Sequence, residues 1–308
     1  MCTTCGCGDE TNTRVSGLLE PAGTVPDGHV DGHDHPHPRD GDGHPHPRDG
    51  DGHAHPHASE DDGHAHSHPH SHDHPHPHRE SISLEQNLLA KNDLLAARNR
   101  GWLAGRGIRA LNVMSSPGAG KTTLLVRTLA DFGERLRAGV IEGDQETSLD
   151  ADRIRAVGRP VVQINTGAGC HLDADMLRRG LDSLDPEAGS TLFIENVGNL
   201  VCPALFDLGE AAKIVIVSVT EGDDKPQKYP HMFRAADLVI INKSDLLPYV
   251  EFDVGEFQRR TRQINPHTEF LVLSATTGDG LAGWYDWLEG TASRSTTLTE
   301  ALTDTLSP

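Results

Sequence analysis

The chain has 308 residues and a formal net charge of −19, and its composition is uneven along its length. Of its 20 histidines, 17 lie between His29 and His78, and no Val, Ile, Leu, Met, Phe, Tyr or Trp occurs between Val30 and Ile82, so this stretch cannot build a hydrophobic core. The acidity disfavours nucleic acid as a partner because it repels the phosphate backbone, and no run approaches the roughly 20 apolar residues that span a membrane.

Residues 1–80 are predicted to be a disordered tail, with 15 acids and 4 Lys or Arg. Asp-Gly-His units recur in it without the apolar residues that a stacked repeat needs, so they are interpreted as low-complexity sequence. Imidazoles at this density predict binding of borderline divalent metals. Composition alone leaves open whether that binding serves storage.

Three cysteines, Cys2, Cys5 and Cys7, lie at the start of the tail. Residues 1–20 lack the basic start and apolar centre of a signal peptide, so we expect a cytoplasmic protein whose thiols stay reduced. Three sulfurs so close together predict a compact metal site. A redox Cys-x-x-Cys pair is the alternative, but no βαβ pattern surrounds it.

The folded domain is predicted over residues 81–290, followed by a flexible, Thr-rich end at 291–308. Ser83–Gln86 fits a helix-start capping box and is expected to begin an amphipathic helix that runs to about Arg100. Apolar runs predict buried strands at residues 110–114, 140–141, 161–164, 191–194, 214–219, 238–241 and 270–273. Predicted helices lie at residues 122–136, 173–184, 254–264 and 281–288. The alternation indicates an α/β fold of the P-loop NTPase class, with a doubly wound, mostly parallel sheet.

A phosphate-binding loop follows the first strand of this domain. Residues 115–122 have the G-x-x-x-x-G-K-[ST] spacing, with Ser115 in place of the first glycine. The glycines let backbone N–H groups curl around phosphates, Lys121 neutralises the β and γ phosphates, and Thr122 is placed to hold Mg²⁺. The predicted nucleotide-binding residues in this loop are Ser116, Gly118, Ala119, Gly120, Lys121, Thr122 and Thr123.

A second loop predicts which base is bound. The strand at residues 238–241 is followed by Asn-Lys-Ser-Asp, the Asn-Lys-x-Asp guanine motif. The carboxylate of Asp245 can accept from two guanine donors that adenine lacks, so GTP is favoured over ATP. The predicted base-binding residues are Asn242, Lys243, Asp245, Ser274 and Ala275.

Two further loops carry carboxylates at strand ends. Asp144 lies in a Gly-Asp-Gln sequence, and Glu195 with Gly198 resembles the D-x-x-G element that senses a γ-phosphate. Ligands of open α/β sheets bind beyond the carboxyl ends of the strands, so both acids are expected near Mg²⁺. Lys121, Asp144 and Glu195 are the catalytic candidates. We find no arginine finger or catalytic glutamine, so slow hydrolysis is expected.

A metal site is predicted at the same end of the sheet. Cys170 and His171 follow one strand, and Cys202 lies four residues beyond Gly198. Two thiolates and an imidazole suit Zn²⁺ or Ni²⁺. A single buried cysteine is usually an inert apolar residue, but the shared position of the three favours ligation. Three ligands leave a tetrahedral site one short, as expected if two subunits meet across it.

These motifs together resemble the hydrogenase-maturation nickel GTPases of the HypB family. The resemblance covers nearly the whole chain. Beyond the N-terminal cysteines, the histidine tract and the phosphate loop, it is carried by Gly-Asp-Gln at 143–145, Glu-Asn-Val-Gly-Asn-Leu-Val-Cys-Pro at 195–203 and Thr-Glu-Gly-Asp-Asp-Lys-Pro at 220–226.

The resemblance implies a GTPase that delivers nickel to the [NiFe]-hydrogenase large-subunit precursor, together with a small zinc-containing accessory metallochaperone. It also implies a GTP-dependent homodimer, metal ligation by Cys170, His171 and Cys202, and a tight nickel site at the N-terminal cysteines. The expected cofactors are GTP, Mg²⁺, Ni²⁺ and Zn²⁺. Two alternatives stay open: a nickel storage or detoxification protein with secondary GTP binding, and a related GTPase that matures urease or a cobalamin enzyme.

Overall fold

An eight-stranded sheet organises the residues that the computed structural model describes, which are 14–16, 77–145 and 148–290. Its strands are β1 Arg14–Ser16, β2 Arg109–Ser115, β3 Ala138–Asp144, β4 Val161–Asn165, β5 Thr191–Glu195, β6 Ala212–Ser218, β7 Leu238–Asn242 and β8 Glu269–Val272. Their order across the sheet is β1-β4-β3-β5-β2-β6-β7-β8. The strands from β2 to β8 are mutually parallel, whereas β1 pairs antiparallel with β4. The prediction of a mostly parallel α/β sheet is confirmed.

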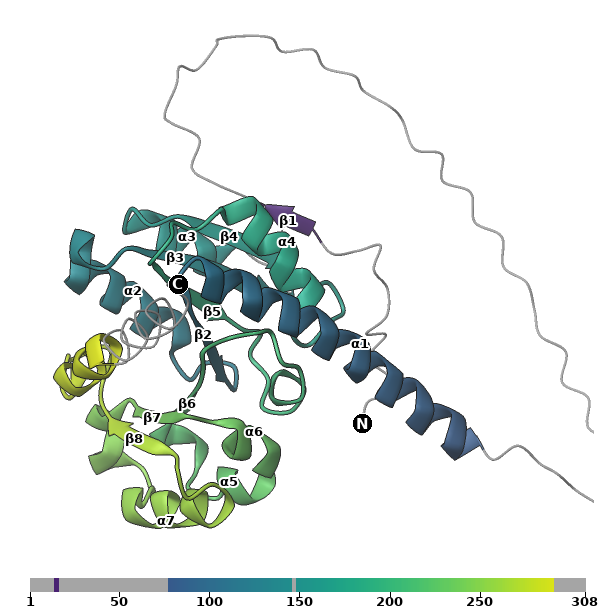
Figure 1. The fold of residues 1–308 in the computed structure, drawn as a ribbon. Helices are drawn as coiled ribbons and strands as arrows, with labels where there is room; N and C mark the ends of the chain where they lie inside the picture. Colours follow the sequence, from purple (N-terminus) through teal and green to yellow (C-terminus); the bar gives the residue numbers. More distant parts are fainter. Residues whose placement is uncertain (1–13, 17–76, 146–147, 291–308) are drawn as a thin grey trace, which may run out of the picture. The chain divides into compact units, whose positions relative to one another are not determined.

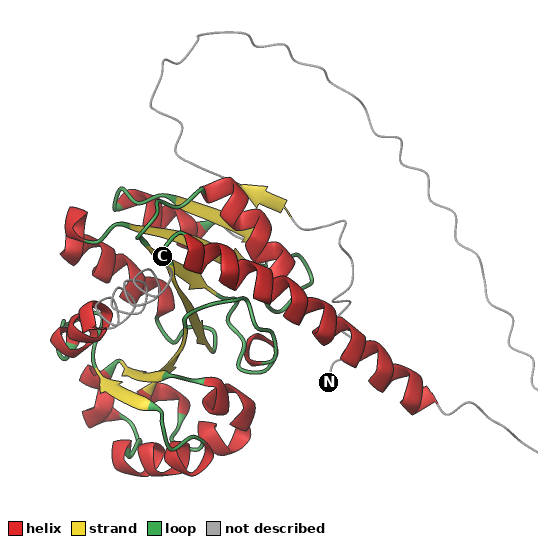
Figure 2. Cartoon of the chain, in the orientation of Figure 1, coloured by secondary structure: helices red, strands yellow, loops and turns green. Residues whose placement is uncertain are grey.

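Helices cover both faces of this sheet (Figures 1 and 2). They are α1 Pro77–Gly105, α2 Lys121–Phe132, α3 Leu149–Ala156, α4 Ala174–Leu184, α5 Lys225–Lys228, α6 Pro230–Ala235, α7 Val254–Ile264 and a last helix at residues 281–290. Short 3-10 turns are η2 Gly133–Arg135, η3 Cys202–Ala204, η4 Val219–Glu221 and η5 Ser244–Tyr249. Within the described residues, no helix is both long and apolar enough to cross a membrane.

Three buried clusters hold the layers together. On one face, α2, α3 and the last helix pack on the sheet around Leu125, Ile154 and Trp284. On the other face, α1 and α4 meet the β3–β4–β5 side through residues such as Leu181, and α6 and α7 meet the β6–β7 side around Phe257. Every residue of β2, β5 and β7 is buried, as expected for parallel strands covered on both faces.

The structure differs from the sequence-based expectations most clearly at the start of α1, at the end of α2 and in an additional strand. Helix α1 already begins at Pro77, so the predicted capping box at Ser83–Gln86 lies inside a helix and does not start one. Helix α2 ends at Phe132, because Gly133 adopts a positive φ of 50° and the chain continues as a 3-10 turn. Strand β1 had no counterpart in the prediction and lies within the region assigned to the tail.

Polar side chains fix the last helix to the domain. The Arg109 side chain donates to the carbonyl of Leu288 at 2.7 Å, and Trp284 Nε1 donates to the Thr128 hydroxyl at 2.8 Å. All of these groups are buried. The helix therefore completes the core beside α2.

Candidate functional site

The phosphate-binding loop connects β2 directly to α2. It places Gly118 at φ +75° and Gly120 at φ +100°. Residues other than glycine rarely adopt these backbone conformations. A Cβ on Gly120 would lie 2.5 Å from Asn242 Nδ2. Lys121, the first residue of α2, donates from Nζ to the Ser115 hydroxyl at 3.0 Å. The loop thus leads into a helix N-terminus, the arrangement that binds phosphate groups.

The predicted base-binding loop lies against the phosphate loop. Asn242 Nδ2 donates to the Ala119 carbonyl at 2.8 Å, while its Oδ1 accepts from the Ala275 N–H at 3.1 Å. Lys243 Nζ donates to the Gly118 carbonyl at 2.7 Å. Asn242 therefore joins the phosphate loop, the loop after β7 and the loop after β8.

The remaining predicted nucleotide-binding side chains lie around the same two loops. Asp245 is in the η5 turn that directly follows β7, and Ser274 is buried after β8. The Thr123 hydroxyl accepts from Arg153 Nη2 at 3.2 Å. The Ser116 hydroxyl donates to Glu221, a residue that sequence reasoning did not single out. Glu221 lies in the Thr-Glu-Gly-Asp-Asp-Lys-Pro segment at 220–226, to which no binding role was assigned, and it also caps the η4 turn.

Glu195 is buried at the end of β5 and contacts the phosphate loop directly. The Thr122 hydroxyl donates to Glu195 Oε1 at 2.6 Å. Burial raises the pKa of Glu195 to about 7, although Lys121 and the Thr122 hydrogen bond oppose this shift. Glu195 Oε2 is buried without a hydrogen-bond partner among the described residues. Such an orphaned carboxylate oxygen beside Thr122 fits a bound cation.

Glu142 is a second buried carboxylate here that sequence reasoning missed. Burial raises the pKa of Glu142 to about 9, with further increases from Glu195, Asp144 and Asp150 and an opposing effect from Lys121. Its Oε2 also finds no partner within the described part of the chain. Glu142 directly follows the apolar pair at 140–141 from which this strand was predicted, and the observed β3 extends past it to Asp144. Several acids around one lysine suit a divalent cation such as Mg²⁺.

The three predicted metal ligands of the domain lie together. Donor atoms of Cys170, His171 and Cys202 are within 4.8 Å of one another, although Cys202 comes from the η3 turn and the other two from the loop after β4. The two Sγ atoms are 2.9 Å apart, and Cys170 Sγ is 3.7 Å from His171 Nδ1. A tetrahedral ion bonded at about 2.3 Å to each sulfur would hold the thiolates further apart, so ligation calls for a small separation of the two loops.

The environment of His171 favours its role as a ligand. Burial lowers the pKa of His171, with Asp173 opposing the shift, so that the imidazole is neutral at physiological pH. The ring stacks on Phe206 at a centroid distance of 3.9 Å. A neutral imidazole with a fixed ring plane, beside two thiols, is a donor set suited to Ni²⁺ or Zn²⁺.

One loop connects the metal cluster with the nucleotide loops. It runs from Glu195, which contacts Thr122, to Cys202 in η3. At Gly198 it lies against the phosphate loop, since a Cβ there would be 3.1 Å from the Cα of Pro117. Asn199 Nδ2 then donates to the Cys170 carbonyl at 3.3 Å. A shift of this loop would therefore change contacts both at the phosphate loop and at the metal ligands.

Some of the predicted sites lie outside the described residues. They are the proposed ligands Cys2, Cys5 and Cys7, the histidine tract between His29 and His76, and the flexible end at residues 291–308.

Comparison with known proteins identifies the family of this arrangement. Residues 109–272 match the family described as CobW/HypB/UreG, nucleotide-binding domain. The chain is 57% identical to the hydrogenase maturation factor HypB of Rhizobium leguminosarum bv. viciae, over 69% of this chain and 71% of that protein. It is 53% identical to the Escherichia coli K12 protein of the same name, over 68% and 73%. The hydrogenase/urease maturation factor HypB of Helicobacter pylori strain J99 is 41% identical, over 68% and 88%.

Solved structures agree with the sequence comparison. The crystal structure of HypB from Helicobacter pylori in complex with nickel has a TM-score of 0.62 and 40% identity, covering 66% of this chain and 96% of that one. HypB from Archaeoglobus fulgidus also has a TM-score of 0.62, with 42% identity and coverage of 66% and 100%. With its P-loop sheet and the Cys-His-Cys cluster beside it, the chain belongs to the HypB family of the CobW/HypB/UreG nucleotide-binding domains.

Proposed function

We propose that the chain is a GTP-hydrolysing nickel metallochaperone that inserts nickel into the precursor of a [NiFe]-hydrogenase large subunit. The observation that carries this proposal is the position of Cys170, His171 and Cys202, one short loop away from the carboxylate that contacts Thr122. Relatives named as hydrogenase maturation factors, and a relative crystallised with nickel, support the same assignment.

In this proposal the phosphate loop and the base loop select and hold GTP. Lys121 balances the charge of the β and γ phosphates, and backbone N–H groups after Gly118 face them. Asp245 accepts from guanine, while Asn242 fixes the loop around it through its bonds to Ala119 and Ala275. An adenine base would leave the Asp245 carboxylate unpaired, which favours GTP.

Thr122 and Asp144 are the proposed ligands of Mg²⁺, with Glu195 next to it. Bound Mg²⁺ would neutralise charge on the phosphates during hydrolysis. Glu195 orients the Thr122 hydroxyl through its 2.6 Å hydrogen bond, and Lys121 stabilises the negative charge that develops on the phosphates. The proposed catalytic residues are Lys121, Asp144 and Glu195. We expect slow turnover because none of them is an arginine.

Nickel is the cargo of the Cys170, His171 and Cys202 cluster, and zinc can compete for the same donors. Loss of the γ-phosphate would release the 195–198 loop, move Cys202 and so loosen the metal. We further propose a GTP-dependent homodimer that brings two clusters together, a small zinc-containing accessory metallochaperone as partner, and a cytoplasmic site of action. The tail would store nickel on its histidines, with a tight site at the N-terminal cysteines.

The test is an equilibrium nickel titration of the full chain and of its Cys202→Ala variant, each with GDP and with a non-hydrolysable GTP analogue. Subtracting the nickel binding of the variant from that of the wild type removes the nickel bound by the tail, which both proteins share. We expect the subtracted affinity to differ between the nucleotides by on the order of fivefold or more, the usual size of coupling between two sites. Coinciding curves would contradict nucleotide-controlled delivery and favour nickel storage by the histidine tract. Full nucleotide-dependent nickel transfer by Cys202→Ala would be equally damaging.

A further inference from the structure

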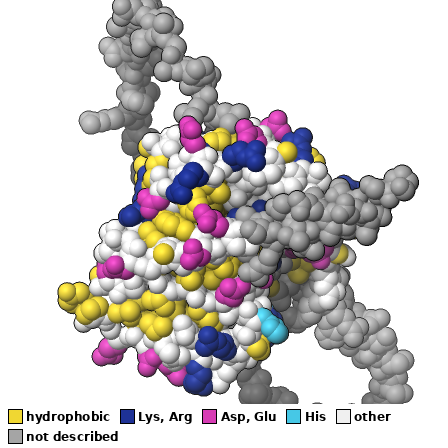
Figure 3. Space-filling view, turned by 60° about the vertical axis from the view of Figure 1, so that its left-hand side comes forward, with side chains coloured by type: hydrophobic (Ala, Val, Ile, Leu, Met, Phe, Trp, Pro, Cys, Tyr) yellow, Lys and Arg dark blue, Asp and Glu magenta, His cyan; other side chains and the backbone are white. Residues whose placement is uncertain are grey.

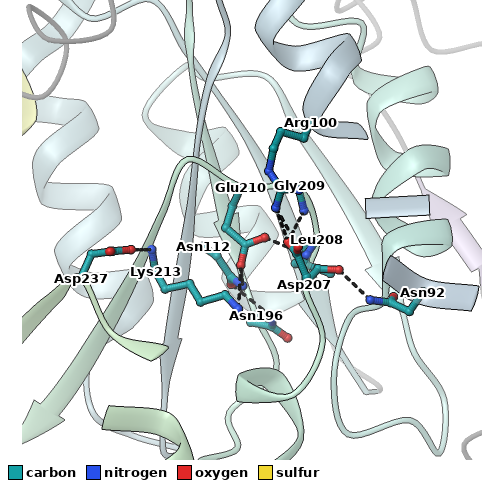
Figure 4. A network of polar contacts seen from close by, with 10 residues as sticks. All are labelled: Asn92, Arg100, Asn112, Asn196, Asp207, Leu208, Gly209, Glu210, Lys213 and Asp237. Carbon is teal, nitrogen blue, oxygen red and sulfur yellow. Dashed lines mark hydrogen bonds and ion pairs between the residues drawn. The ribbon is translucent and has the colours of Figure 1, made fainter. Parts of the chain in front are cut away.

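A chain of buried polar side chains runs from the sheet to the loop between Glu195 and Cys202. Asn112, in the middle of β2, is fully buried, and Asn196 and Glu210 are 1% and 8% exposed. Asn196 Nδ2 donates to Asn112 Oδ1 at 3.2 Å, and Asn112 Nδ2 donates to Glu210 Oε1 at 3.1 Å (Figure 4). Asn112 and Glu210 belong to none of the motifs described above, and Asn196 lies in the 195–203 segment without a role assigned to it.

Asn196, the last member of this hydrogen-bonded series, contacts both the metal loop and the nucleotide-facing loop. Asn196 Oδ1 accepts from the backbone N–H of Leu172 at 3.0 Å and from that of Val197 at 3.0 Å. Leu172 directly follows the metal ligand His171, whereas Val197 belongs to the loop that reaches the phosphate side. One oxygen atom thus bridges the metal loop and the nucleotide-facing loop.

Glu210, at the other end of this hydrogen-bonded series, determines the orientation of the Asn112 and Asn196 side-chain amides. Glu210 accepts hydrogen bonds from Asn112 Nδ2 and from the Leu208 N–H, the latter at 2.7 Å, and forms an ion pair with the Lys213 ammonium at 3.5 Å (Figure 4). A carboxylate offers only acceptors, so Asn112 must turn its NH₂ group toward Glu210 and its oxygen toward Asn196. Asn196 must then donate to Asn112, which leaves its own oxygen facing Leu172 and Val197.

We propose that Asn196 is the positioning residue that couples nucleotide state to metal geometry, and that Glu210 orients it through Asn112. The inference rests on the proposed function. A turned Asn196 amide would place its NH₂ group against two N–H donors and break the bridge. Movement of the 195–198 loop is therefore passed to Leu172, and from there to His171 and Cys170, through a hydrogen bond of fixed polarity.

The experiment follows the metal loop in the full-length chain without any metal. The alkylation rates of Cys170 and Cys202 are measured with GDP and with a non-hydrolysable GTP analogue, and resolved by peptide mass mapping. Deuterium uptake of the peptide that contains Leu172 gives a second readout. In the wild type we expect the alkylation rates to differ between nucleotides by on the order of fivefold.

Two single variants should remove this difference. Asn196→Ala deletes the bridge, so the ratio of rates should fall to about one and Leu172 should exchange faster. Asn112→Leu leaves the bridge oxygen but removes the group that orients it, so the ratio should fall toward one as well. Asn99→Ala is the matched control: Asn99 is 1% exposed and donates to Ala174 and Leu208, so its loss should lower the unfolding midpoint and leave the ratio unchanged.

The orientation step is tested by a rescue. Asn196→Asp keeps two acceptor oxygens, which accept from Leu172 and Val197 whichever way the group is turned. In this background Asn112 is no longer needed, so the double variant Asn196→Asp/Asn112→Leu should recover a ratio close to the wild type. A purely structural role of Asn112 would lower stability without such recovery.

The outcomes separate the inference from the function beneath it. A wild-type difference that survives Asn196→Ala would overturn the inference alone, and so would a double variant no better than Asn112→Leu. Equal rates with both nucleotides in the wild type would overturn the proposed linkage of nucleotide and metal itself. Unfolding midpoints and GDP affinity of each variant identify any loss that comes from misfolding. If Asn196→Ala misfolds, the comparison of Asn112→Leu with the double variant carries the test.

Discussion

Gly120 combines a positive φ with a close neighbour, and both constraints arise from the nucleotide site. The residue has φ +100°, and the space where a Cβ would lie is taken by the Asn242 side chain, which joins the phosphate loop to the base loop. A methyl group at this position would strain the backbone and push Asn242 away from Ala119. The sequence motif requires this glycine for the same physical reason.

Gly120→Ala is therefore expected to lower the free energy of unfolding by about 2 kcal/mol and GDP affinity by on the order of tenfold. Gly158→Ala provides the comparison, since Gly158 has φ +73° but nothing within 4 Å of the place that an added methyl group would occupy. That variant should lose only about 1 kcal/mol and bind GDP normally. Calorimetric GDP titration and thermal unfolding measure both effects, and unchanged GDP affinity of Gly120→Ala would contradict the explanation.

Which side chains could be predicted depended on whether a motif marked them. Lys121, Thr122 and Asn242 were found because their spacing is fixed by contact with a nucleotide. Asn112 was missed because it lies within the predicted strand at 110–114, and Glu142 because it follows the short apolar run at 140–141 and belongs to no motif. A polar side chain in a strand buried on both faces needs a hydrogen-bond or metal partner, and this requirement could have marked both residues.

At the scale of elements, α2 and the last helix are joined by the pair Tyr285 and Asp131. The Tyr285 hydroxyl donates to Asp131 Oδ2 at 2.6 Å, and Arg127 donates to the same oxygen at 2.8 Å. The Tyr285 hydrogen bond and Arg127 hold the pKa of Asp131 below its usual range. The contribution of this pair to stability is present above the unfolded-state pKa near 4 and is lost as pH falls through the lower folded-state value.

Tyr285→Phe should reduce the unfolding free energy by about 1 kcal/mol at neutral pH, a modest value because the pair is partly exposed. The difference from the wild type should begin to shrink below about pH 4, where Asp131 of the unfolded chain takes up a proton, and should vanish once folded Asp131 is protonated at lower pH. Tyr249→Phe alters a tyrosine that is 83% exposed and should leave stability unchanged at every pH. Urea unfolding between neutral and acidic pH decides the matter, and a difference that does not vary with pH would refute the assignment to Asp131.

Elements were predictable where burial imposes a pattern. Strands β2 to β8 each followed from an apolar run, because a parallel sheet covered on both faces needs one. Strand β1 has three residues, with Val15 its only apolar side chain, and its pairing with β4 is a long-range contact that no local pattern announces. The start of α1 was missed because a capping signature reports local preference, while the residues before it are also helical.

Charge is a property of the whole molecule. Residues 1–80 contribute −11 of the net charge of −19, and the rest of the chain contributes −8. On the face shown in Figure 3, acidic and basic side chains are interspersed among apolar ones, so the field there reflects the net sum and not one patch. An acidic protein attracts divalent cations and repels nucleotide anions over distances set by salt.

Nickel association should therefore slow as ionic strength rises from about 0.01 to 0.2 M, over which the Debye length falls from about 30 Å to below 10 Å. Association of GDP should speed up or stay constant over the same range. Stopped-flow measurements of both ligands, with an uncharged small chelator of nickel as reference, give the comparison. Equal salt dependence for the cation and the anion would exclude long-range attraction by net charge.

The antiparallel strand β1 also fixes where the start of the chain is attached. Arg14 pairs with Asn165, the last residue of β4, and Cys170 follows five residues later. Cys7 is seven residues from Arg14, a tether of at most about 25 Å when fully extended. For a metal held by the N-terminal cysteines, the effective concentration of the Cys170 loop would thus be on the order of millimolar. Exchange between the two would be intramolecular, with a rate independent of protein concentration.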